Sequence, residues 1–285
     1  MRRIVSLAPP WLRGPLALSV LPSSGAEERR LVSSILRGES AGNRLSATTM
    51  RDVWLDPTHA SKWDADPLSS NPQRGEQLDL LLDLIADHYL PGTTILDVGC
   101  GSGLVEERLF RRLPEALVLG VDYSPAMIAM AKERLVGKDK QFTILQHDLN
   151  SIEDLRLPIQ RYQVAFSVQA IHNLVPANQR KVISWVRRVL THPGFFFLLD
   201  RTAVPSVDLF SCYRSFWNHQ EKTYATKVDE GQDPSEHQHR LEEEGDSPLT
   251  LDDNLEALAE SGFRASPLEV HGNRALFVCS TCPAP

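Results

Sequence analysis

A short apolar run that ends in three alternating glycines constrains the fold of this chain more than any other feature. The run Thr94–Val98 is largely apolar, glycines follow at positions 99, 101 and 103, and the residues from Glu106 onward favour a helix. Such a run is typical of a buried strand, and glycine permits the tight turn and close ligand approach that a Cβ would prevent. Strand, turn and helix predict the first unit of a doubly wound α/β sheet, in which ligands bind beyond the carboxyl ends of the strands.

The glycine spacing disagrees with two common nucleotide-binding loops. A dinucleotide loop, G-x-G-x-x-G, requires a third glycine where this chain has Leu104, and a P-loop requires Lys and then Ser or Thr after the turn. The missing glycine argues against an NAD-dependent oxidoreductase built on the same sheet. The turn alone leaves the ligand open, because any doubly wound domain could carry Asp97 and Gly99.

One acid and three glycines in this order resemble the first motif of class I S-adenosylmethionine-dependent methyltransferases, D/E-x-G-x-G-x-G. Asp97, Gly99, Gly101 and Gly103 match the motif position for position. The resemblance covers roughly residues 78–280 and points to the small-molecule, quinone-biosynthesis-like branch. It implies an α/β fold with a doubly wound, seven-stranded, mostly parallel sheet and a C-terminal antiparallel hairpin strand, and it implies S-adenosyl-L-methionine as the cofactor.

The other strands are predicted from apolar runs and the turn residues between them. Ser124 and Pro125 mark a helix start after the second strand, because serine caps helices and proline favours the first helical position. Gly272-Asn273 is typical of a tight hairpin between the last two strands. The predicted strands after the first are 117–122, 142–146, 164–168, 195–200, about 265–270 and 274–280.

Acids at the ends of successive strands define the predicted cofactor site. Asp122 ends the second strand 25 residues after Asp97, where an acid can accept hydrogen bonds from both ribose hydroxyls. The resemblance implies that Asp148 binds the adenine amino group and that an adjacent backbone amide binds a ring nitrogen. Simpler interpretations stay open, with Asp122 as a turn residue, Asp148 as a cap on the turn at Asn150 and Met127 as part of the core. The predicted cofactor-binding set is Asp97, Gly99, Cys100, Gly101, Gly103, Asp122, Tyr123, Met127, His147, Asp148, Leu149 and Val168.

Methyl transfer makes modest demands on protein side chains. An in-line displacement at the electrophilic methyl carbon needs alignment at about 3 Å and exclusion of water, and it needs no covalent residue. An acceptor that carries a proton can need a base, and His172, beyond the fourth strand, is the predicted catalytic residue. A single histidine near a site is often structural. Asp200, Arg201 and His219 are further candidates, and Asn173 departs from the His pair common in the family.

Charge and composition favour a small-molecule acceptor. Residues 1–49 hold seven Arg and three Glu, which leaves 23 basic and 34 acidic residues and a net charge of −11 on the remainder. A body this acidic is a poor binder of duplex nucleic acid, because phosphate contacts require clustered Lys and Arg. No uncharged apolar run approaches the ~18 residues of a membrane span. The four cysteines suggest neither a disulfide framework nor a metal site.

The N-terminal regions are expected to lie outside the methyltransferase core, which is predicted over 92–285. Residues 1–49 are rich in Arg and Ser, as in an organelle transit segment, but four prolines break any long helix there. An upstream start codon, with Met50 opening the domain, is the alternative. We expect a cytoplasmic protein, or an organelle matrix protein if 1–49 is a transit segment.

Residues 50–91 and 201–249 are predicted to surround the site. The first region holds Trp54, His59 and Trp63, which either form a lid over the donor or pack against the sheet edge. An amphipathic helix is predicted after them. In the second, aromatic residues at near-helical spacing could roof an acceptor pocket or bury one face of an ordinary helix. Its polar tract includes His237-Gln238-His239, for which solvated extended surface is favoured over a metal site.

The sequence therefore predicts an enzyme that transfers a methyl group from S-adenosyl-L-methionine to an oxygen, nitrogen or carbon atom of a small molecule. A donor-binding protein that serves assembly or regulation without catalysis is one alternative. A tRNA or protein methyltransferase is another. The residues name neither the acceptor nor the oligomeric state.

Overall fold

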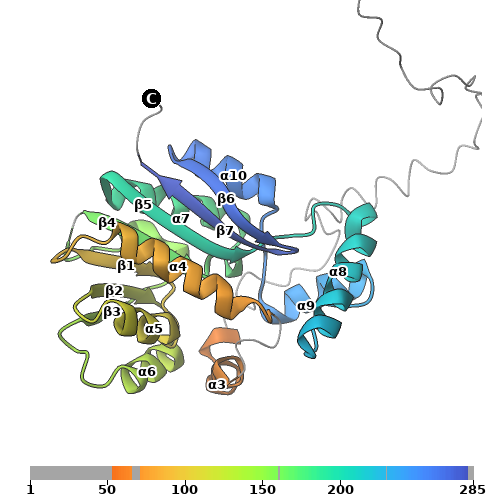
Figure 1. Ribbon diagram of the computed structural model, residues 1–285, viewed down its shortest axis with the longest axis horizontal. Helices are drawn as coiled ribbons and strands as arrows, with labels where there is room; N and C mark the ends of the chain where they lie inside the picture. Colours follow the sequence, from red (N-terminus) through yellow and green to blue (C-terminus); the bar gives the residue numbers. More distant parts are fainter. Residues whose placement is uncertain (1–52, 66–70, 160, 229, 282–285) are drawn as a thin grey trace, which may run out of the picture. The chain divides into compact units, whose positions relative to one another are not determined.

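A mixed β-sheet forms the centre of the molecule. The computed structural model describes residues 53–65, 71–159, 161–228 and 230–281, and the predicted 1–49 extension and Cys282 lie outside these ranges. The sheet has seven strands in the order β3-β2-β1-β4-β5-β7-β6 (Figure 1). The pairs β3–β2, β2–β1, β1–β4 and β4–β5 are parallel, and β7 runs antiparallel to both β5 and β6. The strands are β1 (Thr94–Val98), β2 (Leu117–Asp122), β3 (Phe142–Gln146), β4 (Tyr162–Val168), β5 (Leu190–Arg201), β6 (Arg264–His271) and β7 (Arg274–Ser280). The predicted α/β sheet with its C-terminal hairpin is confirmed.

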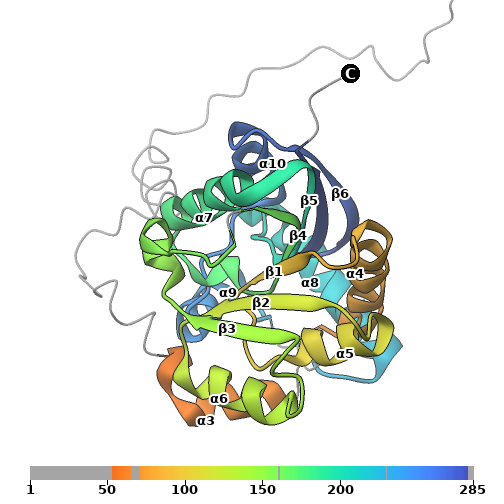
Figure 2. The ribbon, with the colours of Figure 1, turned by 90° about the vertical axis from the view of Figure 1, so that its left-hand side faces the viewer.

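Helices cover both faces of the sheet. Successive residues of a strand point to opposite faces, so that Leu96 of β1 packs with the apolar side of α7 and α10 while Ile95 packs with α4 and α5. Figure 2 shows these two pairs of helices on opposite sides of the sheet. Within the described ranges no helix is both long and apolar enough to cross a membrane. The covering helices are α4 (Arg74–His88), α5 (Leu104–Arg112), α6 (Pro125–Arg134), α7 (Pro176–Val189) and α10 (Leu251–Glu260).

The connection from β4 to β5 differs from the prediction. Helix α7 was not predicted, although Pro176 stands at its first position and residues 182, 183 and 186 bury one face at helical spacing. Strand β5 begins at Leu190, five residues before the predicted start at Phe195. The early part of β5 is irregular in its pairing with β4, where the register shifts between Tyr162 and Val164.

The insertion between β5 and α10 folds into two helices, α8 (Phe210–Tyr224) and α9 (Pro234–Glu244). The prediction of an extended, solvated tract around His237 was wrong. Asp233 caps α9 by accepting hydrogen bonds from two backbone N–H groups, and Pro234 occupies the first helical position. The ring of His237 is buried and stacks on Trp217 of α8 at 5.3 Å, whereas His239 stays exposed.

The segment before the core forms a short helix η2 (Val53–Leu55) and helix α3 (Pro57–Ala65), which pack against α6 (Figures 1 and 2). The indole Nε1 of Trp54 donates to Asn173 Oδ1 at 2.9 Å, and its carbonyl accepts from Ser124 Oγ at 2.5 Å. Asp64 near the end of α3 accepts from Arg134 Nη2 at 2.7 Å and from the hydroxyl of Ser102 in the glycine turn. These contacts fasten η2 and α3 over the carboxyl ends of β1 and β2.

Candidate functional site

A cavity of about 190 Å³ lies at the carboxyl edge of β1, β2, β3 and β4. Ten of the twelve predicted cofactor-binding residues line it, and Gly103 and His147 do not. Strands that run parallel end at one edge of the sheet, and this brings the residues after four different strands to one place. The lining residues that the prediction named are Asp97, Gly99, Cys100, Gly101, Asp122, Tyr123, Met127, Asp148, Leu149 and Val168.

Hydrogen bonds to β2 hold the glycine turn in one conformation. The backbone N–H groups of Gly99 and Cys100 both donate to the carbonyl of Val121, at 2.8 and 3.1 Å. Gly99 has φ +87°, and a Cβ there would lie 2.2 Å from the Cβ of Ala170, so that only glycine fits. Gly103 packs against Leu135 behind the turn, and this explains why it does not reach the cavity.

Asp122 is both a turn residue and part of the cavity wall. Its Oδ2 accepts from the N–H of Gly101 at 2.8 Å and its Oδ1 from the N–H of Ser124 at 2.9 Å. Burial raises the pKa of Asp122, and the backbone donors offset only part of that effect. Asp122 is therefore a turn residue, as one interpretation of the sequence has it, and the hydrogen bonds that make the turn also hold its carboxylate in place beside the cavity.

Asp148 likewise combines a local and a site position. It caps the helix η3 (Leu149–Asp154), and its Oδ1 accepts from the backbone N–H of Asn150 at 2.8 Å and from the Asn150 side chain at 2.9 Å. It also lines the cavity together with Leu149 and Asn150. His147 turns away, with its Nε2 at 2.9 Å from the carbonyl of Ser151.

Arg74, which the sequence prediction did not select, lines the opposite part of the cavity wall together with Trp54 and Trp63. Only 2% of the residue is exposed, its guanidinium lies 4.6 Å from the centre of the Trp63 ring, and Nη1 donates to Gln169 Oε1 at 2.6 Å. Its Nε has no hydrogen-bond partner, and no carboxylate in the described part of the chain forms an ion pair with it. Burial lowers the pKa of Arg74 to about 10, and the nearby Arg274 and Arg108 add to the shift.

One sequence signal could have drawn attention to Arg74. It is the first residue of α4, and a cation at a helix N-terminus opposes the helix dipole. Gln169, its partner, is held at φ +50°, which is uncommon for a residue with a side chain. Arg74 is therefore a buried cation in an unfavourable helix position whose hydrogen-bond partner among the described residues is a neutral amide, while Asp64 attracts it without forming an ion pair.

His172 lies outside the set of residues that line the cavity, in contrast to its predicted catalytic role. Its Nδ1 hydrogen-bonds to Asp200, and its Nε2 lies 3.3 Å from Asp246 Oδ1. Burial lowers the pKa of His172, but attraction to Asp246 and Asp200 outweighs it and raises the pKa to about 9. An imidazolium with both nitrogens engaged cannot take a proton from a substrate, so this arrangement favours a structural role. His219, another candidate, is exposed on α8.

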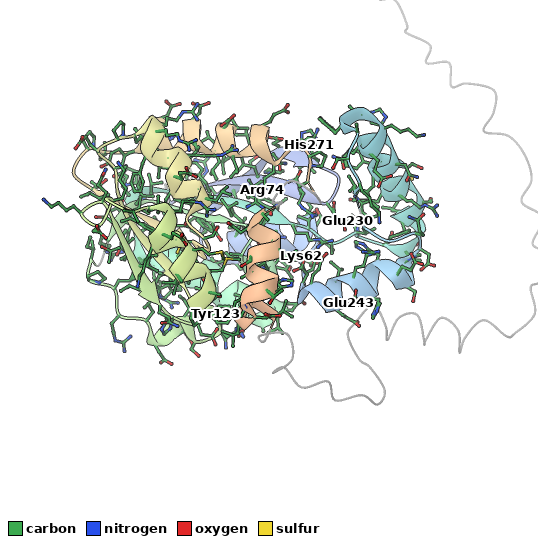
Figure 3. The ribbon with its side chains drawn as sticks, turned by 90° about the horizontal axis from the view of Figure 1, so that it is seen from below. Lys62, Arg74, Tyr123, Glu230, Glu243 and His271 are labelled. Atoms are coloured by element: carbon green, nitrogen blue, oxygen red, sulfur yellow. The ribbon has the colours of Figure 1, made fainter. Side chains whose placement is uncertain are left out.

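The carboxylates around His172 belong to a buried charge network that joins the sheet to the α8–α9 insertion. Arg201 of β5 pairs with Asp246 and Glu244, both at 2.5 Å, and with Glu230. Arg274 of β7 also pairs with Glu230, at 3.1 Å. Figure 3 shows Glu230 between the core and the two helices of the insertion. Burial favours the neutral form of Glu230, but its arginine partners lower its pKa to about 2.

Two further residues that the sequence offers as candidates for a catalytic role belong to this network. Asp200 and Arg201 were considered as residues that could act on an acceptor, and both carry buried ion pairs or hydrogen bonds instead. The aromatic side of α8 packs internally, with Phe210 and Trp217 against Val228, and none of the described α8 residues lines the cavity. In the described part of the chain no group of three or more His, Cys, Asp or Glu could hold a metal ion.

Comparison with known proteins agrees with the fold and the cavity. Residues 95–194 match the methyltransferase domain family. The chain is 32% identical over 110 residues to an uncharacterized methyltransferase of Synechocystis, covering 39% of this chain and 48% of that protein. It is 34% identical over 141 residues to the carboxy-S-adenosyl-L-methionine synthase of Chromohalobacter salexigens, covering 48% and 50%. The chain thus spans about half the length of these curated relatives.

Solved structures extend the likeness to the whole sheet. Magnesium protoporphyrin IX methyltransferase from Synechocystis PCC 6803, with bound SAH, superposes with a TM-score of 0.57 at 16% identity and covers 82% of this chain and 99% of that chain. An O-methyltransferase family protein from Burkholderia thailandensis gives a TM-score of 0.58 at 12% identity and covers 92% and 70%. Residues 95–194 are thus similar to the methyltransferase domain family, and the chain shares the fold of solved methyltransferases.

Removal of the shared carboxylate of the charge network should destabilise the fold. In Glu230→Gln, the buried Arg201 and Arg274 lose their common counter-ion, and we expect the free energy of unfolding to fall by about 3–5 kcal/mol. Urea denaturation followed by circular dichroism measures this. Glu243→Gln, an exposed control on the same insertion, should change stability by no more than about 0.5 kcal/mol. Equal stability of the two variants would contradict the importance of the network.

The His172 cation makes stability depend on pH. Because its pKa is about 9 in the folded protein and 6.5 without these neighbours, its contribution is fully present below pH 6.5 and is lost as the pH rises through about 9. We expect the free energy of unfolding to decline over this interval in the wild type. In His172→Gln the decline should be absent. Urea titrations at several pH values test this, and an identical pH profile in both proteins would refute it.

Proposed function

We propose that this protein transfers the methyl group of S-adenosyl-L-methionine to an oxygen, nitrogen or carbon atom of a small molecule. The observation that carries the proposal is the convergence of Asp97, Asp122 and Asp148, from the ends of β1, β2 and β3, on the cavity bounded by the glycine turn. A methyl donor of this kind offers groups that match them, namely an adenine, a ribose and an amino acid.

The residues of the cavity suit the donor in both shape and charge. In this proposal Asp148 and Leu149, which line the cavity, bind the adenine, and the carboxylate of Asp122, held by the N–H of Gly101, accepts from the ribose hydroxyls. At the other end, Asp97 and Arg74 are buried opposite charges, and neither forms an ion pair with a described residue. Buried charges need partners. The ammonium and carboxylate of an amino acid would supply one for each.

The position of Arg74 relative to the glycine turn supports this pairing. Its partner Gln169 directly precedes Ala170, against which Gly99 packs. Arg74 and the turn that follows Asp97 therefore meet the same short segment after β4. A guanidinium suits a carboxylate because it can donate two parallel hydrogen bonds.

The chemistry supplied by the donor is simple. Its methyl–sulfur bond breaks as the acceptor's electron pair forms a bond to the methyl carbon, and the bonding pair stays on sulfur. The protein's contribution is to bind and orient the two reactants and to keep water out, which accounts for large accelerations without a covalent residue. Trp54 and Trp63, on η2 and α3, are part of the cavity wall and close it on the lid side.

The acceptor is proposed to be a small molecule that is neutral or cationic. The net charge of −11 outside residues 1–49 supports this over duplex nucleic acid. We also propose a reducing compartment, the cytoplasm or an organelle matrix. Cys100, Cys212 and Cys279 are all free thiols, in keeping with such a compartment.

Transfer of labelled methyl groups tests the proposed activity. The purified protein, incubated with a metabolite extract and S-adenosyl-L-methionine labelled in the methyl group, should move label into a defined small molecule. An equal amount of Gly99→Ala protein, whose turn cannot close, is the control. Label in tRNA or protein alone would overturn the small-molecule proposal, and no transfer despite donor binding would favour a non-catalytic role.

Replacement of Asp122 should weaken donor binding, through loss of its carboxylate and of the turn hydrogen bonds that it accepts, while the sheet stays folded. Asp122→Ala removes a charged hydrogen-bond acceptor worth ~1.5–3 kcal/mol, so we expect the Kd for S-adenosyl-L-methionine to rise at least tenfold. Calorimetry measures the affinity, and thermal unfolding checks the fold. The exposed Asp154→Ala is the matched control and should bind as the wild type does. Unchanged affinity in Asp122→Ala would contradict the proposal that Asp122 binds the ribose.

Replacement of Arg74 should separate the amino-acid end of the donor from its adenosyl end. In Arg74→Gln the donor's carboxylate loses its charged partner, and we expect the Kd for S-adenosyl-L-methionine to rise at least about tenfold. 5′-Methylthioadenosine lacks the amino acid, so its affinity should be the same in both proteins. A parallel loss for both ligands would show that Arg74 supports the fold of the cavity and does not contact the carboxylate.

A further inference from the structure

A second buried acid, Glu106, lies beneath the glycine turn beside Asp97. It belongs to the first turn of α5, and both residues are almost completely buried, with 0% and 1% of their surfaces exposed. The two carboxyl groups are in hydrogen-bond contact with each other. The backbone N–H of Glu106 faces its own carboxyl group, and otherwise neither oxygen of Glu106 nor the buried Oδ1 of Asp97 has an N–H or O–H donor among the described residues.

Among the described residues, one positive group faces the two carboxyl groups, and it is already engaged with other partners. The titratable groups that face the pair are Asp122 at the end of β2, the thiol of Cys100 and the guanidinium of Arg134 on α6. Arg134 is already committed, since it donates to Asp64 at 2.7 Å and to the carbonyl of Ser102 at 2.5 Å. Burial first, and then the neighbouring acids, raise the pKa of Asp97.

Two carboxyl groups in contact and out of water cannot both be ionised, and the stable arrangement is one proton between them. A protonated carboxyl gains the donor hydrogen that the pair otherwise lacks. Only Asp97 of the two lines the cavity, and Glu106 lies behind it. A positive group arriving in the cavity therefore favours the negative charge on Asp97 and the proton on Glu106.

We propose that Glu106 is a positioning residue that shares a proton with Asp97. When the donor's ammonium group is bound, Glu106 keeps that proton and uses it to donate a hydrogen bond to the Asp97 carboxylate. The hydrogen bond orients the Asp97 carboxylate toward the cavity and keeps the pair at a single negative charge, which matches one ammonium group. The part of this proposal that concerns the ammonium group rests on the proposed function. The shared proton does not.

Three variants and two ligands test the proposal. Glu106→Gln imitates the protonated acid, because its amide can donate to Asp97 with nearly the same shape, and Glu106→Leu removes the hydrogen bond altogether. Glu107→Gln, on the neighbouring and more exposed residue, is the control. The ligands are S-adenosyl-L-methionine and 5′-methylthioadenosine, which lacks the ammonium group.

Infrared spectroscopy of the ligand-free proteins at neutral pH examines the shared proton directly. The wild type and Glu107→Gln should show the carbonyl band of a buried protonated carboxyl group, and Glu106→Gln should lack it, because Asp97 then ionises against the amide. The difference spectrum between wild type and Glu106→Gln isolates this band from other acids. A spectrum without that difference would overturn the shared proton, whatever the ligands do.

Calorimetry examines the positioning role. Glu106→Gln should bind S-adenosyl-L-methionine within about threefold of the wild type, and Glu106→Leu at least about tenfold more weakly. All variants should bind 5′-methylthioadenosine equally. Wild-type affinity in Glu106→Leu, or an equal loss for both ligands, would overturn the positioning role. If the wild type binds neither ligand, the proposed function fails, and the infrared result still decides the question of the proton.

Discussion

The site depends on the hydrogen bonds that join the glycine turn to the end of β2. Two backbone N–H groups of the turn share the carbonyl of Val121, and a third, from Gly101, reaches the carboxylate of Asp122. These bonds fix the distance between the ends of β1 and β2, and they leave Asp122 beside the open side of the turn. Gly99 is indispensable because a Cβ at that position would collide with Ala170 after β4. The ends of β1, β2 and β4 are thereby held together as one wall of the cavity.

Charges are distributed unevenly around this wall. Around the cavity, Asp97 and Arg74 are buried without an ion-pair partner in the described part of the chain, a costly arrangement that the proposed binding of an amino-acid group would relieve. Behind the sheet's carboxyl edge, Arg201 and Arg274 instead form ion pairs with acids of the insertion. The first set is available for a ligand, and the second fastens α8 and α9 to the core. This contrast is what separates the residues proposed to act from those that hold the structure.

The strands and the acids at their ends could be predicted because they depend on local sequence. Apolar runs, turn glycines and the spacing of Asp122 after Asp97 are visible within a few residues of each strand, and most of the predicted cofactor residues do line the cavity. Arg74 and Glu106 could not be selected in this way. Their significance comes from the lack of ion-pair partners among the described residues, and for Arg74 the one local signal, a cation at the start of a helix, is weak. His172 shows the opposite case, since its proximity to the site was visible but its two carboxylate neighbours come from β5 and from the segment after α9.

Helix α9 was missed for a related reason. Its surface residues are mostly polar, and its one buried histidine packs on Trp217, twenty residues earlier in the chain, so periodicity alone gave a weak signal. Its capping residues, Asp233, Pro234 and Gly245, did mark both ends and were the better guide.

The central claim is that the cavity at the carboxyl edge of the sheet binds a methyl donor. Calorimetric titration of the full chain with S-adenosyl-L-methionine, and separately with NAD⁺, tests it most directly. The account predicts saturable binding of one donor molecule per chain and no binding of NAD⁺, because Leu104 occupies the place of the third glycine of a dinucleotide loop. Binding of NAD⁺ in place of the donor, or of neither, would contradict it.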